Sequence, residues 1–153
     1  SGLKDAGNTL TQRTMEPGCS CVVTLDSSGM KEGDYAGLCA LQGRFGQVGI
    51  AVENGARYLL CIQMGEGGEE TEYRQPLENA VVQLRIVFDY RNRIDQASFA
   101  FRIPEEEWQT AGKPLDMVFT LDMFVGYRIG IFCYGLQTSG GHADFRDFSV
   151  QEL

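Results

Sequence analysis

FVGYRIGIFCYGLQTSGGHADFRDF, residues 124–148, reads as two β-strands joined by a glycine-rich turn. Aromatic and β-branched residues fill Tyr127 to Tyr134, and these residue types favour a pleated surface with one buried face. Residues 138–141, TSGG, interrupt the pattern as a turn does. In the second strand, 143–150, the apolar positions change from odd to even numbers (Ala143 and Phe145, then Phe148 and Val150). This change of parity predicts a β-bulge near Arg146 and Asp147.

Short strands are predicted along the rest of the chain, because apolar and polar residues alternate in many segments. The clearest alternation runs from Val82 to Tyr90, and a return strand over 97–103 ends at Pro104. Asn54-Gly55 is a strong hairpin signal between two further strands. Many short strands with frequent turn signals, and no long helical period, predict an all-β fold. We therefore expect a two-sheet antiparallel β-sandwich in a single domain over residues 1–153.

Two segments are expected to lie outside the sheets. Gly65 to Arg74, GEGGEETEYR, is acidic and glycine-rich, and it is predicted to be a loop at one tip of the fold. Glu105 to Thr110 is predicted to form one helical turn, because Pro104 stands where proline is favoured at a helix start.

The charge of the chain argues against two classes of partner. It has 21 acidic and 13 basic side chains and a net charge of −8. Such a charge opposes binding to nucleic acid and to anionic membrane surfaces. No apolar run approaches the roughly 18 residues of a membrane span. We therefore expect neither nucleic acid nor membrane as a partner, whereas a neutral polysaccharide carries no charge to be repelled.

The five cysteines are expected to be reduced thiols, which suits a reducing or anaerobic setting. They are Cys19, Cys21, Cys39, Cys61 and Cys133. An odd number without regular spacing is not a disulfide framework, and cysteine in an apolar strand behaves as a small hydrophobic residue. The sequence contains no CxxC pair and no histidine near a cysteine, so a zinc site is not expected.

GYRIGIFCYG (126–135) followed by GGHADFRDF (140–148) resembles the closing strands of the C-terminal domain of family 43 glycoside hydrolases. These enzymes are β-xylosidases and α-L-arabinofuranosidases. NTLTQRT (8–14) is similar to an early strand of that domain, and LDSSGMKEGDYAGLCALQGRFGQVGI (25–50) to its central hairpin region. The resemblance implies a concanavalin A-like jelly roll. Resembling domains usually begin with an earlier Trp-containing strand. This sequence lacks that strand, so the N-terminal strand is either missing or supplied by another chain.

The resemblance also implies an accessory role. In the resembling enzymes the catalytic carboxylates lie on a separate five-bladed β-propeller, and the loop before the GYR strand reaches toward it. An aromatic residue on that loop helps to close the substrate pocket, and Phe124 is the matching position. The alternative for Phe124 is burial in the core. The resemblance thus implies a non-catalytic accessory domain of a xylan-degrading family 43 enzyme, with the catalytic β-propeller and plant cell-wall polysaccharide as partners.

Sugar binding requires flat apolar side chains and planar hydrogen-bonding groups, and the chain offers both. Trp108 fits either an exposed platform or a plug at one end of the sandwich. The candidates for carbohydrate binding or for an interface are Phe124, Tyr127, Arg128, Gln42, Arg44, Gln47 and Trp108, with Phe45 and Tyr134 as further aromatic choices. Two alternatives to the accessory role remain open: an independent carbohydrate-binding module for xylan, xyloglucan or β-glucan, and a purely structural β-sandwich.

No catalytic constellation can be assigned from the sequence. A glycosidase needs an acid and a carboxylate that flank the scissile bond. Glu105 to Glu107 and the acidic residues of 66–72 instead suit a solvated surface. His142 is the only histidine and is expected at a turn, with no Ser-His-Asp set around it. No cofactor is expected. A structural calcium ion is possible, because Asp144 and Asp147 lie near the predicted bulge. Calcium needs about 6–8 oxygen ligands, however, and these two residues supply only part of such a set.

Overall fold

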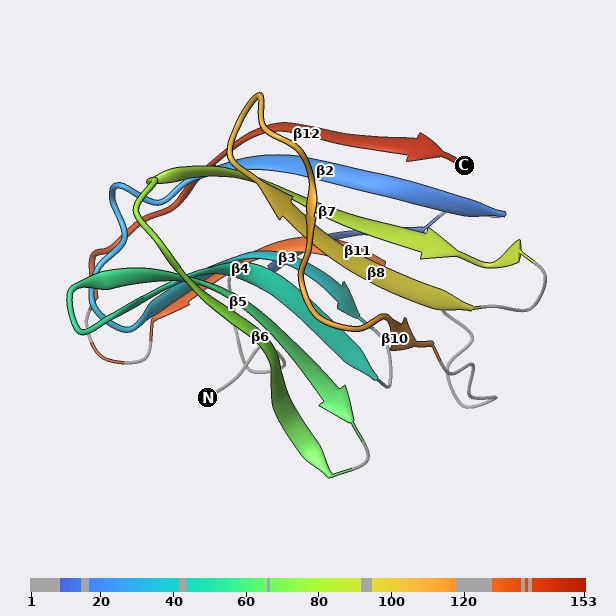
Figure 1. The fold of residues 1–153 in the computed structure, drawn as a ribbon, viewed down its shortest axis with the longest axis horizontal. Coiled ribbons are helices and arrows are strands. Elements are labelled where there is room, and N and C mark those ends of the chain that lie inside the picture. The colour runs from blue at the N-terminus through green and yellow to red at the C-terminus, as the bar shows by residue number, and fades with distance from the viewer. Residues whose placement is uncertain are drawn as a thin grey trace.

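The computed structural model describes residues 9–14, 17–41, 44–65, 67–91, 95–117, 128–135, 137 and 139–153. Within these ranges the chain forms twelve β-strands and no α-helix. The strands assemble into two antiparallel sheets, here called sheet A and sheet B (Figure 1). The predicted all-β, two-sheet antiparallel sandwich is therefore confirmed. No helix of the described ranges is long and apolar enough to cross a membrane.

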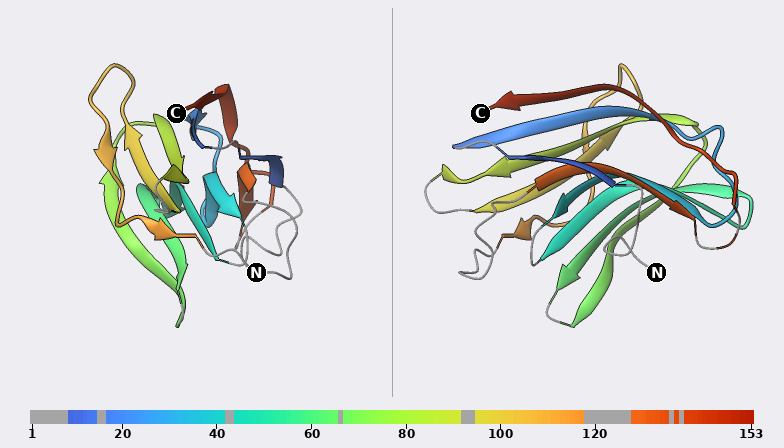
Figure 2. Two further views of the ribbon diagram at one scale, coloured as in Figure 1. Left: turned by 90° about the vertical axis from the view of Figure 1, so that its right-hand side faces the viewer. Right: turned by 180° about the vertical axis from the view of Figure 1, so that it is seen from behind.

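Sheet A contains six strands in the order β1-β11-β3-β4-β5-β6. The tip of the β5–β6 hairpin extends beyond its neighbours (Figures 1 and 2). The bounds of its strands are β1 (Thr9–Arg13), β3 (Asp34–Leu41), β4 (Phe45–Glu53), β5 (Ala56–Gly65), β6 (Gly68–Leu77) and β11 (Arg128–Gly135).

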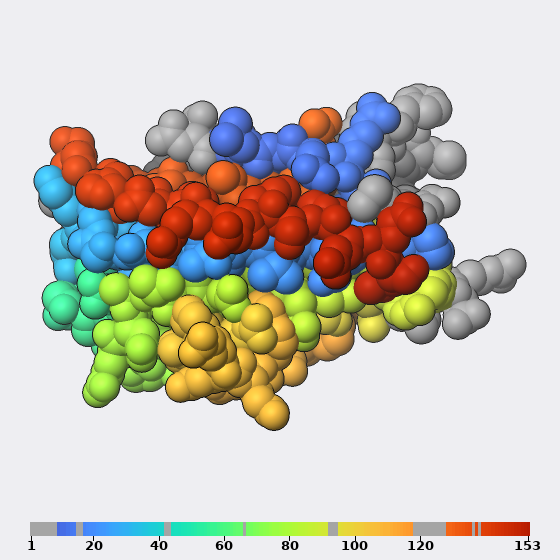
Figure 3. Space-filling model, turned by 90° about the horizontal axis from the view of Figure 1, so that it is seen from above, coloured from blue at the N-terminus to red at the C-terminus, as the bar shows by residue number. Residues whose placement is uncertain are grey.

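Sheet B has the order β10-β8-β7-β2-β12, and the short β9 also pairs with β8. Seen from above in Figure 3, β12 (red) runs between β1 (dark blue) and β2 (lighter blue), so the edge strands of the two sheets lie close together. The bounds of its strands are β2 (Gly18–Asp26), β7 (Val81–Asp89), β8 (Gln96–Arg102), β9 (Gln109–Thr110), β10 (Leu115–Asp116) and β12 (Asp144–Glu152).

The main core lies between the two sheets. Strand β7 alternates strictly between half-buried and buried residues, as its sequence predicts. Its buried side chains meet those of β2 and β8 in sheet B and the inner residues of β3, β4, β5 and β11 in sheet A. Gly46 in β4 leaves room for the ring of Phe99 in β8, because a Cβ atom at Gly46 would collide with that ring. The close packing of the two sheets therefore explains why position 46 is occupied by glycine.

A second apolar cluster covers the outer face of sheet A, the face that points away from sheet B. It contains Tyr35, Cys39, Phe45, Ala51, Leu60 and Phe132, all buried. Because side chains alternate between the two faces of a strand, burial on both faces removes the alternation from the burial pattern. Seven of the eight residues of β3 are accordingly buried.

The predicted turn and bulge are both present. Asn54 and Gly55 have positive φ values of 52° and 73°, as a two-residue hairpin turn requires. The register between β12 and β2 shifts between Arg146 and Ser149, and Asp147 has a φ of 55°. The parity change in the sequence therefore marks a real β-bulge, which turns Phe145 and Val150 toward the core.

Two predictions about local structure are wrong. Residues 68–77 do not form a loop but strand β6, which pairs with β5 along its length. Charged side chains and Pro76 suit it to the edge of sheet A, because both discourage pairing with another chain. Residues 105–110 form no helical turn: Glu106 N–H donates to Ile103 O at 2.9 Å, Glu105 has a φ of 70°, and β9 follows. Pro104 therefore occupies the second position of a β-turn, another favoured place for proline.

All five cysteines are free, as predicted. Cys19, Cys21, Cys39 and Cys61 are buried and Cys133 is half-buried. Burial raises the pKa of the Cys21, Cys39 and Cys61 thiols to about 12. These thiols are therefore protonated at neutral pH and act as apolar core residues.

Candidate functional site

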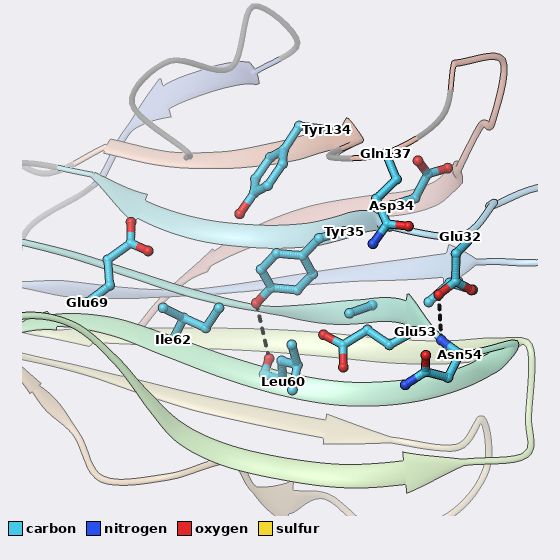
Figure 4. Close-up of a pocket in the computed structure, with 13 residues that line it drawn as sticks. Glu32, Asp34, Tyr35, Glu53, Asn54, Leu60, Ile62, Glu69, Tyr134 and Gln137 are labelled. Carbon is cyan, nitrogen blue, oxygen red and sulfur yellow. Dashed lines mark hydrogen bonds between the residues drawn. The ribbon is translucent and has the colours of Figure 1, made fainter. Parts of the chain in front are cut away.

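A pocket of about 370 Å³ opens on the outer face of sheet A. Strands β3, β4, β5, β6 and β11 and the loop before β3 supply its lining residues. Figure 4 shows Tyr35 and Tyr134 in the middle of the pocket, with Glu69 at one end and Glu32 and Glu53 at the other. The pocket combines an aromatic wall with an acidic rim.

The aromatic wall is held rigidly. The ring of Tyr35 meets Phe132 edge-on at 4.9 Å between centroids and Tyr134 at 5.8 Å. The buried Tyr35 hydroxyl donates to Leu60 O at 3.3 Å (Figure 4). Desolvation by burial raises the pKa of both Tyr35 and Tyr134, so both remain neutral phenols. The half-buried Tyr134 offers a flat face and a hydroxyl group, the two features that a sugar ring can use.

Gln47 brings an unpartnered polar atom to the same face of the sheet. Its side chain is 1% exposed, and its Nε2 donates to the Tyr134 hydroxyl at 3.3 Å. Its Oε1 is buried and has no hydrogen-bond partner within the structure. A buried acceptor without a partner typically costs about 1–3 kcal/mol. Gln47 Oε1 is therefore an unsatisfied acceptor that lies buried below this face, next to residues that line the pocket.

Three of the four acidic groups that line the pocket stabilise the fold. Glu32 accepts hydrogen bonds from the backbone N–H groups of Asn54 and, at 3.0 Å, Gly55, and so fixes the β4–β5 turn. Asp34 Oδ2 accepts the Lys31 N–H at 2.9 Å. Glu53 pairs with Arg74 at 2.7 Å. These three carboxylates hold backbone or cationic partners, which is unlike the acid and base pair of a glycosidase.

The structure brings only some of the predicted site residues to this face. Gln47 and Tyr134 meet there, as described. Arg128 belongs to the same face, but its Nε donates to Thr11 Oγ1 at 2.9 Å. Arg44 instead lines a separate groove with Lys113 and Glu72. Phe124, Tyr127 and Gln42 lie outside the described residues.

Trp108 lies elsewhere and does not plug an end of the sandwich. It is half-buried on the outer face of sheet B, where the guanidinium groups of Arg85 and Arg102 lie over its ring. The interpretation as a plug is wrong because Trp108 follows the β-turn after β8 and folds back over the outward side chains of β7 and β8. It is a surface residue that two cations hold in place.

Several pocket residues were not found from the sequence, among them Tyr35, Glu32 and Leu60. DYAGLCAL, the sequence of β3, contains no alternation that distinguishes an inner face from an outer one. Its one usable signal is the run of small and apolar residues itself, because such a run is typical of a strand buried on both faces.

The predicted calcium ligands do not form a cluster. Asp144 Oδ2 lies 4.0 Å from His142 Nε2, and Asp147 occupies the bulge. No group of three or more His, Cys, Asp or Glu side chains in the described ranges is arranged to hold a metal ion. A calcium ion therefore stays a prediction that rests on sequence alone.

The chain is similar to known domains over almost its whole length. The model of the "Beta xylosidase C-terminal Concanavalin A-like domain" matches residues 2–151. No curated protein matches the chain. Its fold is similar to part of a solved bifunctional GH43-CE protein of Bacteroides eggerthii, with a TM-score of 0.94, 36% identity and 99% of this chain covered.

Other solved structures show the same fold at lower identity. One is a GH43 glycoside hydrolase engineered for endo-xylanase and exo-arabinofuranosidase activity, with a TM-score of 0.86, 23% identity and 95% of this chain covered. Another is a xylan β-1,4-xylosidase of Bacillus halodurans, with a TM-score of 0.75, 19% identity and 93% covered. The chain spans 20%, 31% and 29% of these three proteins. The match over residues 2–151 shows that this chain belongs to the C-terminal concanavalin A-like domains of β-xylosidases.

Proposed function

We propose that this chain is a non-catalytic accessory domain of a xylan-degrading family 43 glycoside hydrolase and supports the catalytic domain of that enzyme. The observation that carries the proposal is the family match over residues 2–151, together with the 20% of the Bacteroides eggerthii protein that the chain spans. A domain that makes up one fifth of a GH43 protein leaves ample chain for a separate catalytic domain.

Three of the four carboxylates that line the pocket already have partners, which supports a role without catalysis. Retaining glycosidases place two carboxyl groups about 5–5.5 Å apart, and inverting ones about 6.5–9.5 Å apart, with both free to act on the sugar. Glu32, Asp34 and Glu53 instead serve the backbone or Arg74. We therefore expect the isolated chain to release no sugar from aryl-xyloside or aryl-arabinoside substrates.

We place the contact with the catalytic domain at an apolar groove between the edge strands β1 and β12. Leu10 is 73% exposed and Phe148 is 41% exposed, and Ile129 and Ile131 line the floor between them. An exposed apolar groove of this kind is typical of an interaction surface. Phe124, which the resemblance implies at the contact, remains a further prediction.

Interface variants test this proposal. Leu10→Ser and Phe148→Ser remove apolar side chains that are already exposed, so each should melt within a few degrees of the parent chain. Each should weaken docking to the catalytic domain of the parent enzyme, measured by titration calorimetry, by about tenfold or more as interface anchors do. Leu153→Ser is the matched control, since Leu153 is 43% exposed but does not line the groove. Docking that is unchanged in both groove variants would contradict this placement.

A second function is favoured by the unpartnered Gln47 Oε1. The outer face of sheet A combines that acceptor with the phenols of Tyr35 and Tyr134, which suits a neutral sugar. We propose weak binding of a plant cell-wall polysaccharide there. Affinity should be measured on xylan, arabinoxylan, xyloglucan and β-glucan, for the parent chain and for Gln47→Leu and Tyr134→Phe. Equal affinity of all three proteins for every polysaccharide would rule out this site.

A further inference from the structure

The outer face of sheet B carries a pair of arginines that no acidic side chain of the described residues neutralises. Arg85 on β7 and Arg102 on β8 place their Cζ atoms 4.4 and 4.5 Å from the centroid of the Trp108 ring. Among the residues that the structure describes, neither guanidinium forms an ion pair. The absence of a carboxylate is notable in a chain with 21 acidic side chains and only 13 basic ones.

The register of sheet B builds a polar row beside this pair. Arg146 lies opposite Thr24, Thr24 opposite Gln83, and Gln83 opposite Arg102, so all four side chains project from the same face. Arg102 Nε donates to Gln83 Oε1, and Gln83 Nε2 donates to Thr24 Oγ1 at 3.4 Å. The row fixes the orientation of Arg102 and places amide and hydroxyl groups next to the two guanidinium groups. In Figure 3 the orange-yellow segment that carries Trp108 stands on this face beside β7.

Arg85 is the less satisfied member of the pair. Its Nε is buried and has no hydrogen-bond partner in the part of the chain that the structure describes. Desolvation by burial, followed by the charge of Arg102, lowers the pKa of Arg85. An anion bound beside the two arginines would offset the repulsion between them and accept hydrogen bonds from guanidinium N–H groups at the surface.

Arg74 shows that stacking on an aromatic ring does not by itself leave an arginine unpaired. Its Cζ lies 4.0 Å from the centroid of Tyr58, yet Glu53 also binds it at 2.7 Å. A stacked guanidinium keeps its edge free for two parallel hydrogen bonds to a carboxylate. At Arg74 the chain supplies that carboxylate, and at Arg85 and Arg102 none of the described residues does.

We propose that Arg85, Arg102 and Trp108 form a binding site for a sugar that carries a carboxylate, namely a uronic acid residue of an acidic polysaccharide. The two guanidinium groups bind the carboxylate, and Gln83 and Thr24 are placed for hydroxyl groups of the same or the next sugar. The inference rests on the proposed function, because a polysaccharide meets this domain only if the parent enzyme acts on one. The site is separate from the pocket on sheet A.

Trp108 is the only tryptophan, so its fluorescence reports on this site directly. The protein is titrated with a glucuronic acid-substituted xylo-oligosaccharide, with the unsubstituted oligosaccharide of equal length, with oligogalacturonate and with sodium acetate. We expect a saturable change in Trp108 emission with at least one acidic oligosaccharide. The substituted xylo-oligosaccharide and oligogalacturonate differ in their backbone, so a comparison of their responses identifies which backbone is bound. Binding should weaken as salt is added, because the site is at the surface.

Arg85→Gln and Arg102→Gln should each weaken this binding about tenfold or more, and Arg74→Gln should leave it unchanged. Melting curves show that each variant is folded, and Arg102→Gln carries the test if Arg85→Gln does not fold. The proposal is overturned if no acidic oligosaccharide gives a saturable response, if the neutral oligosaccharide gives the same response, or if acetate does so at equal concentration. Equal weakening by Arg74→Gln would also overturn it. These titrations use this domain without a catalytic domain. A negative result therefore rules out the acidic-sugar site only, and the docking experiments still test the accessory role.

Discussion

The outer faces of the two sheets differ in burial and in polarity. The outer face of sheet A adds a second buried layer to the fold, whereas the outer face of sheet B presents polar side chains to solvent. In sheet A, β3 and β4 are buried on both faces in their central parts, and Phe132, Tyr35 and Phe45 form a second apolar layer. In sheet B, β7 is fully buried only on its inner face, and polar or charged side chains such as Arg85 and Gln83 project outward. Apolar and aromatic side chains therefore collect on the outer face of sheet A, whereas the outer face of sheet B carries Arg85 and Arg102, which form no ion pair with the described residues.

The largest expected effect tests whether the second layer of sheet A is a true core. Phe132→Ala should destabilise the protein by about 3–5 kcal/mol, as much as Phe88→Ala between the sheets, because both rings are at most 1% exposed. Val87→Ala, on the outer face of sheet B, should cost less than about 1 kcal/mol. Urea unfolding followed by circular dichroism gives the three values. A cost for Phe132→Ala close to that of Val87→Ala would show that the outer face of sheet A is not a core.

The buried thiols predict an alkaline loss of stability that is the same on both faces of sheet A. The folded pKa of Cys39, in the outer layer, and of Cys61, on the inner face, is raised from 9.0 to about 12. The unfolded chain therefore releases these protons first. Stability is fully present below pH 9 and falls between pH 9 and 12, by about 1.4 kcal/mol per pH unit for each thiol.

Unfolding measured from pH 8 to pH 11 checks this expectation. Cys39→Ala and Cys61→Ala should each make the decline less steep by a similar amount, although each variant starts from a lower stability. A decline that only Cys61→Ala reduces would mean that Cys39 is solvated, and the outer layer of sheet A would be open.

Glu32→Ala should have a smaller effect, at the rim of the same face. The substitution removes the acceptor of the Asn54 and Gly55 N–H groups, which then bond to water, and the expected cost is about 1 kcal/mol. Glu32→Gln should restore part of the loss, since an amide oxygen accepts one of the two hydrogen bonds. Unfolding midpoints that are identical for the parent and Glu32→Ala would show that the β4–β5 turn does not depend on this carboxylate.

Arg74→Gln gives the smallest expected change. Arg74 is exposed and its pair with Glu53 is a surface ion pair, which contributes little in water and is screened by salt. The urea midpoint should be the same as that of the parent at physiological ionic strength. A clear loss that disappears at high salt would instead show that edge strand β6 relies on this pair.

The comparison of the two faces also explains how much the sequence predicted. Strands β7, β8 and β12 of sheet B, the Asn54-Gly55 turn and the bulge at Asp147 were all predicted, because each has a local signal in period or in backbone preference. The short strands β9 and β10 were not predicted, and β9 lies in the segment that was expected to be a helical turn. Strand β6 was not, because its glycine-rich start and acidic residues resemble a loop until β5 pairs with it. Pairing between strands is not encoded within either strand alone.

The candidate site was predicted less well than the fold. Gln47 and Tyr134 were named as candidates, but they meet only because β4 and β11 both pair with β3, which the spacing of 87 residues does not reveal. For Trp108 the sequence left a platform and a plug both open, because nothing in WQTAGK indicates that Arg85 and Arg102 lie over its ring. Such contacts depend on the register of neighbouring strands.

The most direct test of the accessory role compares the parent enzyme with and without this domain. Removal of the domain should lower the melting temperature of the catalytic domain by several degrees and reduce its turnover of xylo-oligosaccharides, and the separate domain should restore both when it is added back. A catalytic domain that melts and turns over substrate identically without this chain would contradict the account.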